Sequence, residues 1–161
     1  MPIRVLARRE LDEMAVIVVG VDHSDGAKAA LQFALEEAKL RRATLRVVHA
    51  WQYGYIGATG LEGAYPALGG DIRELRDGAH SALEETLRES IPATNTVEIE
   101  RRVVEGRPAA VLVDESQGAD LLVVGSRGHG GFTGLLLGSV SQQCAHHASC
   151  PVVIVHRKPE H

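Results

Sequence analysis

The amino-acid sequence predicts an α/β protein built around a doubly wound parallel sheet, with five strands and four helices. Two short runs, residues 15–21 and 120–125, are almost entirely apolar and rich in β-branched side chains. Such runs are typical of strands that are covered on both faces, as parallel strands are. The predicted strands alternate with segments of helical spacing, and a strand, helix, strand order requires a right-handed parallel crossover. This alternation determines the fold class.

The first part of the chain contains a complete strand, helix, strand unit. The run 15–21 ends at Asp22, and Ser24 is placed to cap a following helix. That helix is amphipathic, with apolar residues recurring at helical spacing at Ala27, Ala30, Leu31, Ala34, Leu35 and Ala38. Residues 44–51 form the second predicted strand.

The middle of the chain begins with an unusually long loop. Residues 52–70 contain tyrosines and glycines without a sustained helix or strand period. Such a loop is either a cover over a functional site or a disordered insertion, and both interpretations stay open. Residues 72–91 have helical spacing and stop before Pro92. Residues 97–103 then alternate apolar with charged side chains, which is typical of a strand at a sheet edge.

The last third repeats the alternation. The segment 106–108 opens a third helix, because proline is favoured in the first helical turn, and Gly118 ends it. Another buried strand follows at 120–125. After a glycine-rich loop, residues 139–142 have the Ser-x-x-Gln spacing of a capping box, which predicts that the serine caps the fourth helix. The final strand is 151–156.

Composition indicates one folded domain. Of the 161 residues, 45% are hydrophobic and 24% charged, as in ordinary globular proteins. Residues 1–14 are strongly charged and are predicted to be a tail, which leaves residues 15–158 as the domain. The formal charge of -4 gives no positive field for nucleic acid or an anionic membrane, so neither is an expected partner.

Two observations bear on the compartment. No apolar run reaches the ~20 residues that a membrane-spanning helix needs. The two cysteines do not make a disulfide framework, and the N-terminal stretch lacks the apolar segment of a secretory signal. We therefore expect a cytoplasmic location.

The glycine-rich loop after residue 125 carries the main functional signal. It precedes a helix whose N-terminus offers unpaired N–H groups and a positive dipole end to an anion. The hydroxyls of Ser126, Ser139 and Ser141 add possible donors, so a phosphate fits there. A Walker loop is excluded because the loop has no lysine, and Thr133 stands where a dinucleotide fingerprint needs its third glycine. The structural alternative is that the glycines only form tight turns and Ser139 only caps its helix.

The same glycines form a spaced motif, Gly125-x2-Gly128-x9-Gly138-Ser139, and the first strand ends in Val21-Asp22-His23-Ser24. Together these residues resemble the nucleotide-binding pattern of the universal stress protein family, over residues 15–156. The resemblance implies a parallel sheet of order 3-2-1-4-5, like that of adenine nucleotide α-hydrolases, and a site for ATP or another adenine nucleotide. It also implies a homodimer through the final strand, whose apolar edge needs a cover.

Carried over position by position, the resemblance implies contacts with the nucleoside. Asp22 and the backbone of Val21 would lie beside adenine and ribose, and Ala50 would form a wall of the adenine pocket. The structural alternative for Asp22 is a carboxylate that helps to cap the first helix through its neighbours.

The resemblance also implies contacts with the ribose and the phosphates. Three residues would approach ribose and phosphates: Gly125, Arg127 and Gly128. Four more would hold the phosphate tail: Gly138, Ser139, Val140 and Ser141. Because Arg127 is the sole cation in the glycine loop, the charge of a triphosphate requires backbone N–H groups, the helix dipole and Mg²⁺ as well. No residue is placed to activate water at the γ-phosphate, so we assign no catalytic residue.

Other histidines and cysteines are assigned structural roles. The group Cys144, His146, His147 and Cys150 matches none of the usual zinc-ligand spacings, so no metal site is predicted and the cysteines are expected to be small buried hydrophobes. His129 is interpreted as an exposed loop residue, and His49 as a hydrogen-bonded core residue.

Three functions follow from these patterns. The first is a dimeric regulatory module that binds an adenine nucleotide and whose occupancy changes contacts with an unknown protein partner. The second is a slow ATPase or phosphotransferase that uses the same site. The third is a purely structural interaction dimer whose pocket stays empty.

Overall fold

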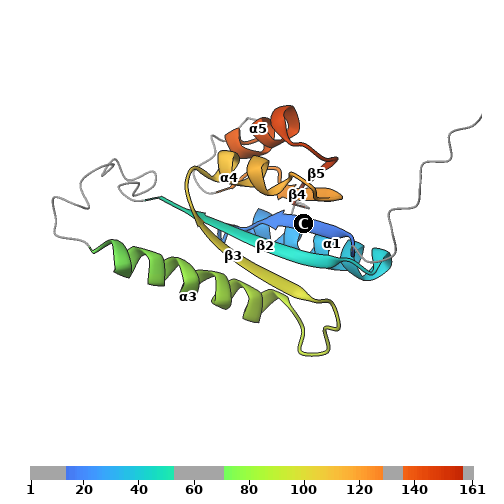
Figure 1. Ribbon diagram of the computed structural model, residues 1–161, viewed down its shortest axis with the longest axis horizontal. Helices are drawn as coiled ribbons and strands as arrows, with labels where there is room; N and C mark the ends of the chain where they lie inside the picture. The colour runs from blue at the N-terminus through green and yellow to red at the C-terminus, as the bar shows by residue number, and fades with distance from the viewer. Residues whose placement is uncertain (1–13, 53–70, 129–135, 158–161) are drawn as a thin grey trace, which may run out of the picture.

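The computed structural model describes residues 14–52, 71–128 and 136–157 (Figure 1). Its centre is a five-stranded parallel sheet in the order β3-β2-β1-β4-β5, which confirms both the predicted fold class and the predicted strand order. The strands are β1 (Val16–Gly20), β2 (Thr44–Trp51), β3 (Ile99–Glu105), β4 (Leu121–Gly125) and β5 (Val152–Val155).

Helices cover both faces of the sheet. They are α1 (Asp25–Arg41), α3 (Ile72–Ser90), α4 (Pro108–Glu115) and α5 (Ser139–His147). The first two pack on one face and the last two on the other, so the described residues form three layers (Figure 1). The predicted cap of α1 is confirmed, because Ser24 Oγ accepts a hydrogen bond from Ala27 N at 3.1 Å. Pro108 is the first residue of α4, as predicted.

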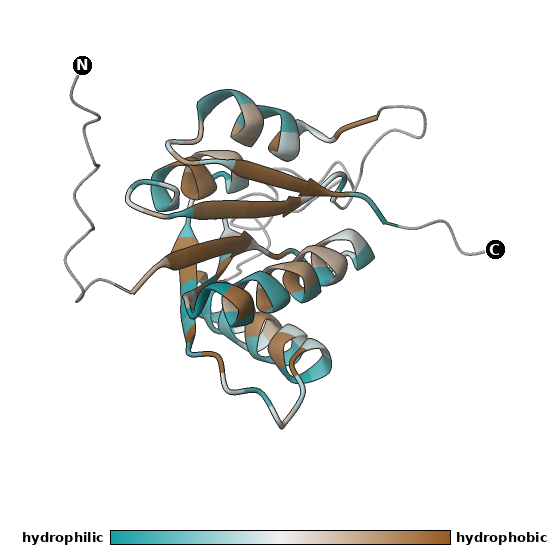
Figure 2. Cartoon of the chain, turned by 90° about the vertical axis from the view of Figure 1, so that its right-hand side faces the viewer, coloured by the Kyte–Doolittle hydropathy of each residue, from teal (hydrophilic) through white to brown (hydrophobic). Residues whose placement is uncertain are grey.

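Two apolar clusters, one on each face, explain the unbroken apolar runs in the sequence. Successive side chains of a strand point to opposite faces. In β1, Ile17 and Val19 are fully buried against α1 and α3, whereas Val18 is buried against α4 and α5. Figure 2 shows strands of the sheet coloured brown, the hydrophobic end of the scale. Each residue of a central strand therefore has an apolar neighbour.

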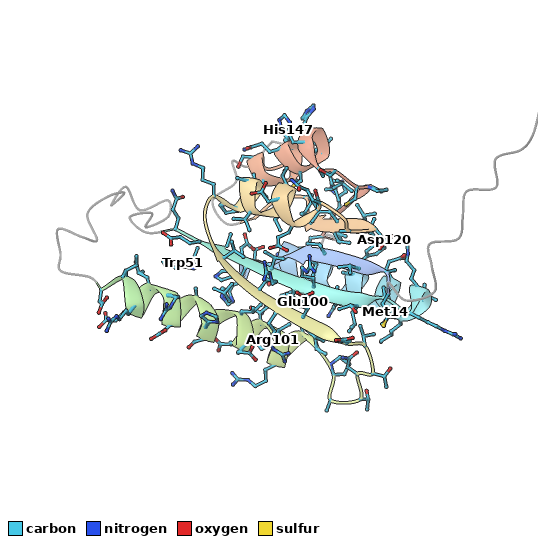
Figure 3. All side chains as sticks on the ribbon, viewed as in Figure 1. Met14, Trp51, Glu100, Arg101, Asp120 and His147 are labelled. Atoms are coloured by element: carbon cyan, nitrogen blue, oxygen red, sulfur yellow. The ribbon has the colours of Figure 1, made fainter. Side chains whose placement is uncertain are left out.

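The two edge strands differ in chemistry. β3 pairs within the described sheet only with β2, which confirms the predicted edge, and it carries Glu100 and Arg101 (Figure 3). β5 lies at the opposite edge, and its four apolar residues are all half-buried.

Some predictions lie outside the described residues. These are the tail, except for Met14, the loop 52–70 beyond Gln52, and His129. Within the described ranges, none of the helices combines the length and the apolar character that crossing a membrane requires.

Candidate functional site

The carboxyl ends of the parallel strands meet at one edge of the sheet. The chain leaves β1 toward β2 on one side, while β4 lies on the other side, so the strand order reverses between β1 and β4. In open α/β sheets, ligands bind in the crevice beyond this reversal. The turn after β1 and the loop after β4 therefore frame the candidate site.

The turn after β1 is tightly hydrogen-bonded. Val21 N donates to Val48 O at 2.9 Å, and Val21 O accepts from His49 Nδ1 at 2.9 Å. Asp22 Oδ1 accepts from both the backbone N and the hydroxyl of Ser24. The Asp22 carboxylate thus orders the residue that caps α1, which is the structural role that the sequence left open beside nucleotide binding.

His23 joins this turn to α3. Its backbone has a positive φ of 66°, a conformation that costs energy for a residue other than glycine. The buried Thr86 hydroxyl donates to Ala82 O at 3.1 Å and accepts from His23 Nδ1 at 2.7 Å. The His23 and His49 rings meet edge to face, with centroids 5.6 Å apart. His49 is hydrogen-bonded, as predicted, but it is half-buried and not fully in the core.

Glycines allow the loop after β4 to touch the start of α1. A Cβ on Gly125 would lie 2.9 Å from the carbonyl of Gly26, and a Cβ on Gly26 would lie 2.7 Å from Arg127 O. Both distances are shorter than any ordinary contact of a Cβ atom. The backbone of the loop after β4 therefore lies directly against the backbone of the first turn of α1. A Cβ on Gly128 would overlap a carboxylate oxygen of Asp22. The structure therefore brings together Asp22 and Gly128, which are far apart in the sequence.

The start of α5 is tied to the same loop. Gly138 N donates to Ser126 O at 2.7 Å, and the Ser141 hydroxyl donates to Ser126 O at 2.9 Å and to Gly138 O at 3.0 Å. Ser141 is 2% exposed, so its hydroxyl serves a contact inside the protein. The predicted phosphate residues 138 and 141 thus converge on Ser126.

The predicted capping box at α5 is wrong. Gly138, with φ -78° and ψ 169°, is the N-cap, and Ser139 is the first helical residue, with no side-chain cap. The reason is a tertiary contact: the hydrogen bond from Gly138 N to Ser126 O holds Gly138 in the N-cap position, directly before the helix. The first intrahelical bond from a backbone N–H goes from Gln142 N to Gly138 O at 3.1 Å. The N–H groups of residues 139–141 therefore precede the helical hydrogen-bond ladder.

Ala50 and Val140 lie on the opposite face of the sheet from His23. Both are half-buried and pack against the apolar cluster under α4 and α5. Ala50 is on β2, at the same edge of the sheet as Val21. The structure places it at the predicted edge.

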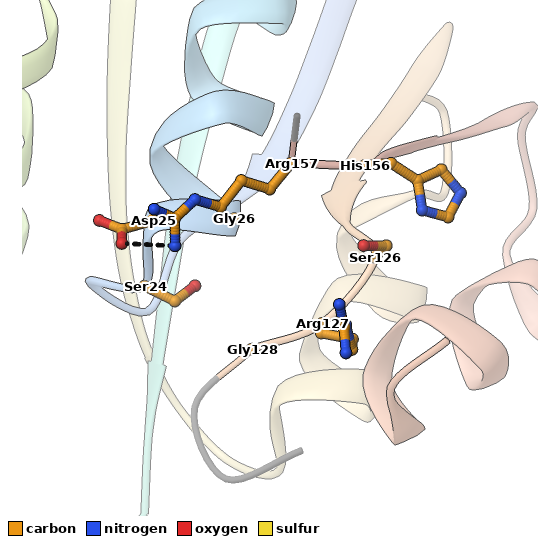
Figure 4. Close-up of a pocket in the computed structure, with 8 residues that line it drawn as sticks. All are labelled: Ser24, Asp25, Gly26, Ser126, Arg127, Gly128, His156 and Arg157. Atoms are coloured by element: carbon orange, nitrogen blue, oxygen red, sulfur yellow. Dashed lines mark ion pairs between the residues drawn. The ribbon is translucent and has the colours of Figure 1, made fainter. Parts of the chain in front are cut away.

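A pocket of about 370 Å³ opens between the start of α1, the loop after β4 and the end of β5 (Figure 4). Its lining residues are Ser24, Asp25, Gly26, Ser126, Arg127, Gly128, His156 and Arg157. Three of them, residues 126–128, were predicted from the sequence. The other predicted residues lie outside this lining.

The pocket contains charges of both signs. Arg157 Nη1 lies 3.0 Å from Asp25 Oδ2, and Figure 4 marks this ion pair with a dashed line. Arg127 and His156 are both exposed on the loop side. Two arginines and one carboxylate thus line the pocket.

The sequence interpretation missed the contribution of β5. His156 and Arg157 follow the last strand directly, so the rule that ligands lie at carboxyl ends of strands pointed to them. His23 carried no such signal, because its contact with Thr86 joins residues from different segments of the chain.

The cysteines differ in their surroundings. Cys144 is completely buried, and burial raises the pKa of its thiol to about 11. Cys150 is half-buried. In the ranges that the structure describes, no three potential metal-ligand side chains of His, Cys, Asp or Glu cluster together.

The chain is similar in sequence to a known protein family and to its curated members. A sequence profile of the Universal stress protein family matches residues 14–156. A universal stress protein of Mycolicibacterium smegmatis is 35% identical over 144 residues, which cover 89% of this chain and 46% of that protein. The chain spans just under half the length of the curated relatives that it matches.

Solved structures gave further matches. The universal stress protein UspA from Lactobacillus plantarum has a TM-score of 0.70 at 23% identity, covering 88% of this chain and 97% of that one, and shares the fold. A universal stress protein in complex with cAMP has a TM-score of 0.56 at 30% identity, covering 89% and 97%. The universal stress protein from Archaeoglobus fulgidus in complex with dAMP has a TM-score of 0.51 at 27% identity, covering 88% and 97%.

Proposed function

This chain belongs to the universal stress protein family, and we propose that it binds an adenine nucleotide at the edge of the sheet between β1 and β4. Two similar proteins whose structures contain cAMP and dAMP support the adenine base. We propose ATP, held with Mg²⁺, as the nucleotide, because the uncapped N-terminus of α5 and the loop residue Arg127 are groups suited to a phosphate tail.

One observation carries the proposal: the turn after β1 and the start of α5 both contact the loop after β4. Gly128 packs against the Asp22 carboxylate, so the nucleoside segment meets the loop after β4. The carbonyl of Ser126 accepts from both Gly138 and Ser141, so the phosphate segment meets the same loop. A ligand that spans base, ribose and phosphate would contact all three segments.

The phosphate end is proposed at the start of α5. The N–H groups of Ser139, Val140 and Ser141 lie before the first intrahelical hydrogen bond, and no side chain caps this helix. An anion in this position would take the place of a cap and interact with the positive end of the helix dipole. Gly125, Arg127 and Gly128 would lie along the ribose and the first phosphates.

The nucleoside end is proposed at the turn after β1. The Val21 N–H and carbonyl already have protein partners, but a carbonyl oxygen has a second lone pair that can accept from the adenine amino group. Asp22 directs one oxygen to Ser24 and the other toward Gly128, where ribose hydroxyls would donate. Ala50 supplies an apolar wall.

We propose a regulatory role, with nucleotide occupancy changing the contacts of a cytoplasmic homodimer with a protein partner. The dimer would form through residues 151–156, because half-buried apolar side chains at the β5 edge favour a second chain as a cover. Replacing Ile154 with lysine should convert a dimer to a monomer in sedimentation equilibrium. A wild-type protein that sediments as a monomer would contradict the dimer.

The binding proposal is tested by isothermal titration of nucleotide-free protein with ATP, ADP, AMP, cAMP and GTP, with and without Mg²⁺. The variant Gly128→Asp places a second carboxylate against Asp22 and should abolish binding. Gly78→Asp is the matched control, because a Cβ there meets nothing within 4 Å. Selective binding of adenine nucleotides that only Gly128→Asp removes is the expected result. Absence of binding by the parent protein would refute the proposal.

The same samples separate binding from catalysis. Release of inorganic phosphate from ATP over many turnovers, lost in Gly128→Asp and retained in Gly78→Asp, would favour a slow ATPase or phosphotransferase. Binding without turnover supports the regulatory module.

A further inference from the structure

Two histidines, His23 and His49, meet beside the turn after β1, and neither has been given a contact with the nucleotide. His23 lies in that turn, and His49 is on β2. We propose that these histidines position the backbone of Val21 for the nucleoside, and that a proton taken up by the pair weakens nucleoside binding. The inference rests on the proposed nucleotide site, because it concerns the end of that site where adenine would bind.

His49 holds the carbonyl of Val21. Its Nδ1 lies 2.9 Å from Val21 O, and because a carbonyl oxygen only accepts, Nδ1 carries a proton and donates it. The backbone N of Val21 is fixed as well, since it donates to Val48 O at 2.9 Å. Both backbone polar groups of Val21 are therefore tied to β2, and the carbonyl that we propose for the adenine amino group has a fixed direction.

His23 ties the same turn to α3. Thr86 is 1% exposed, and its single hydroxyl proton goes to Ala82 O at 3.1 Å. The Thr86 oxygen therefore accepts from His23 Nδ1 at 2.7 Å, so the ring of His23 is also protonated at Nδ1. His23 has a φ of 66°, and a residue other than glycine keeps such a conformation only where its surroundings hold it. The bond to the buried threonine is a contact of that kind.

The two rings form a coupled pair. Their centroids are 5.6 Å apart and their planes are inclined at 63°, which is an edge-to-face contact. Because Nδ1 is already protonated in both rings, a proton on Nε2 decides whether each ring is charged. Two positive rings at this distance repel each other, so the two histidines titrate together and not independently.

The charged groups near His23 come from its own turn and from two helices. Glu89 of α3 interacts electrostatically with His23 and pairs with Lys28 of α1 at 2.8 Å. The other ionisable groups of the turn and of these helix ends are Asp22, Asp25, Glu85 and Arg88. Carboxylates outnumber cations among the groups named, so a positive charge on the pair is stabilised there. Histidine is the side chain whose charge ordinarily changes between about pH 5 and 8.

A proton on the pair makes the Val21 carbonyl a poorer acceptor for adenine. A charged imidazolium donates a stronger hydrogen bond than a neutral ring does, so His49 would draw more electron density from this carbonyl. The positive charge would also repel the partly positive hydrogens of the adenine amino group. Both effects act on the base, so they should lower the affinity for adenosine, which has no phosphate.

The test separates the charge of the two rings from their hydrogen bonds. An asparagine amide donates from the position of Nδ1 but does not titrate, and asparagine tolerates a positive φ. The double variant His23→Asn/His49→Asn therefore removes the charge and keeps a donor at each position, whereas His49→Ala removes the donor. His147→Asn is the matched control, since His147 is an exposed histidine at the end of α5. Adenosine is titrated by calorimetry into the full chain at pH 6 and pH 8, and ATP at pH 8.

We expect the parent chain to bind adenosine about fivefold more weakly at pH 6 than at pH 8, the scale of one hydrogen bond. The double asparagine variant should lose this difference, and His147→Asn should keep it. His49→Ala should bind adenosine about fivefold more weakly than the parent at pH 8, and more weakly than the double asparagine variant.

Two results would overturn the inference while ATP binding leaves the proposed function intact. One is an equal affinity of the parent chain for adenosine at the two pH values, and the other is a difference that persists in the double asparagine variant. Binding of ATP without any binding of adenosine would also overturn the inference, because the turn would then not hold the nucleoside. Absence of both would refute the proposed function as well.

Discussion

Replacing Gly26 with alanine tests whether the start of α1 and the loop after β4 are in backbone contact. In a helix, alanine is favoured over glycine by about 0.5–1 kcal/mol. At Gly26, however, the new Cβ would lie 2.7 Å from the carbonyl oxygen of Arg127, which belongs to the backbone and cannot rotate away. Overpacking of this kind costs about 1–3 kcal/mol. We therefore expect Gly26→Ala to lower the free energy of unfolding by about 1 kcal/mol.

Gly78→Ala provides the contrast for the same substitution. Gly78 is an exposed residue within α3, and a Cβ there meets nothing within 4 Å. Only the helical preference applies, so this variant should gain about 0.5–1 kcal/mol. Urea unfolding measures both values, and thermal unfolding should move by roughly 2–4 °C per kcal/mol for a chain of this size. A Gly26→Ala variant that gains as much stability as Gly78→Ala would refute the close packing on which the site is built.

Two further predictions concern the rest of the fold. The Glu115 side chain is 11% exposed and pairs with both Arg46 and Arg102, so Glu115→Ala should lower the free energy of unfolding in urea by about 2 kcal/mol. Glu84→Ala removes an exposed ion pair with Arg101 and should lower it by less than about 1 kcal/mol. Equal losses in the two variants would contradict the role of burial. The buried Cys144 thiol, whose pKa is raised to about 11, should not react with a thiol reagent at pH 8 until the protein is unfolded. The contribution of this thiol to stability is complete below its ordinary pKa of 9.0 and is lost as the pH rises toward 11. Cys144→Ala should therefore flatten this part of the stability profile, and an unchanged slope would contradict the assignment.

Local patterns predicted the order and type of the elements, although the strand predicted at 97–103 lies at Ile99–Glu105. The strand 44–51 and the cap at Ser24 were read correctly from β-branched runs and from one serine before an amphipathic segment. The capping box at Ser139 failed because the same local pattern was overridden by a distant contact, the hydrogen bond from Gly138 to Ser126. Patterns of a few residues predict elements well when no tertiary contact competes with them.

The candidate site was predicted in part. The residues of the glycine motif were named from the sequence, since their spacing and their place after a strand indicate a phosphate site. The partnership of Asp22 with Gly128, the bond from His23 to Thr86 and the ion pair between Asp25 and Arg157 were not predicted. Each of these contacts joins residues that are far apart in the sequence, and no sequence pattern links the two partners.

The sequence by itself determined the fold class, the element order and the chemistry available to the site, because these depend on periodicity and residue type within short segments. Only the tertiary structure decided which hydroxyl, carboxylate and guanidinium meet at the pocket. Ser126 O accepts from the Ser141 hydroxyl, and Arg157 is set against Asp25, because the strands that precede these residues end at the same edge. The physical reason is that side-chain contacts depend on how the helices pack across the sheet, and that packing is a property of the whole chain.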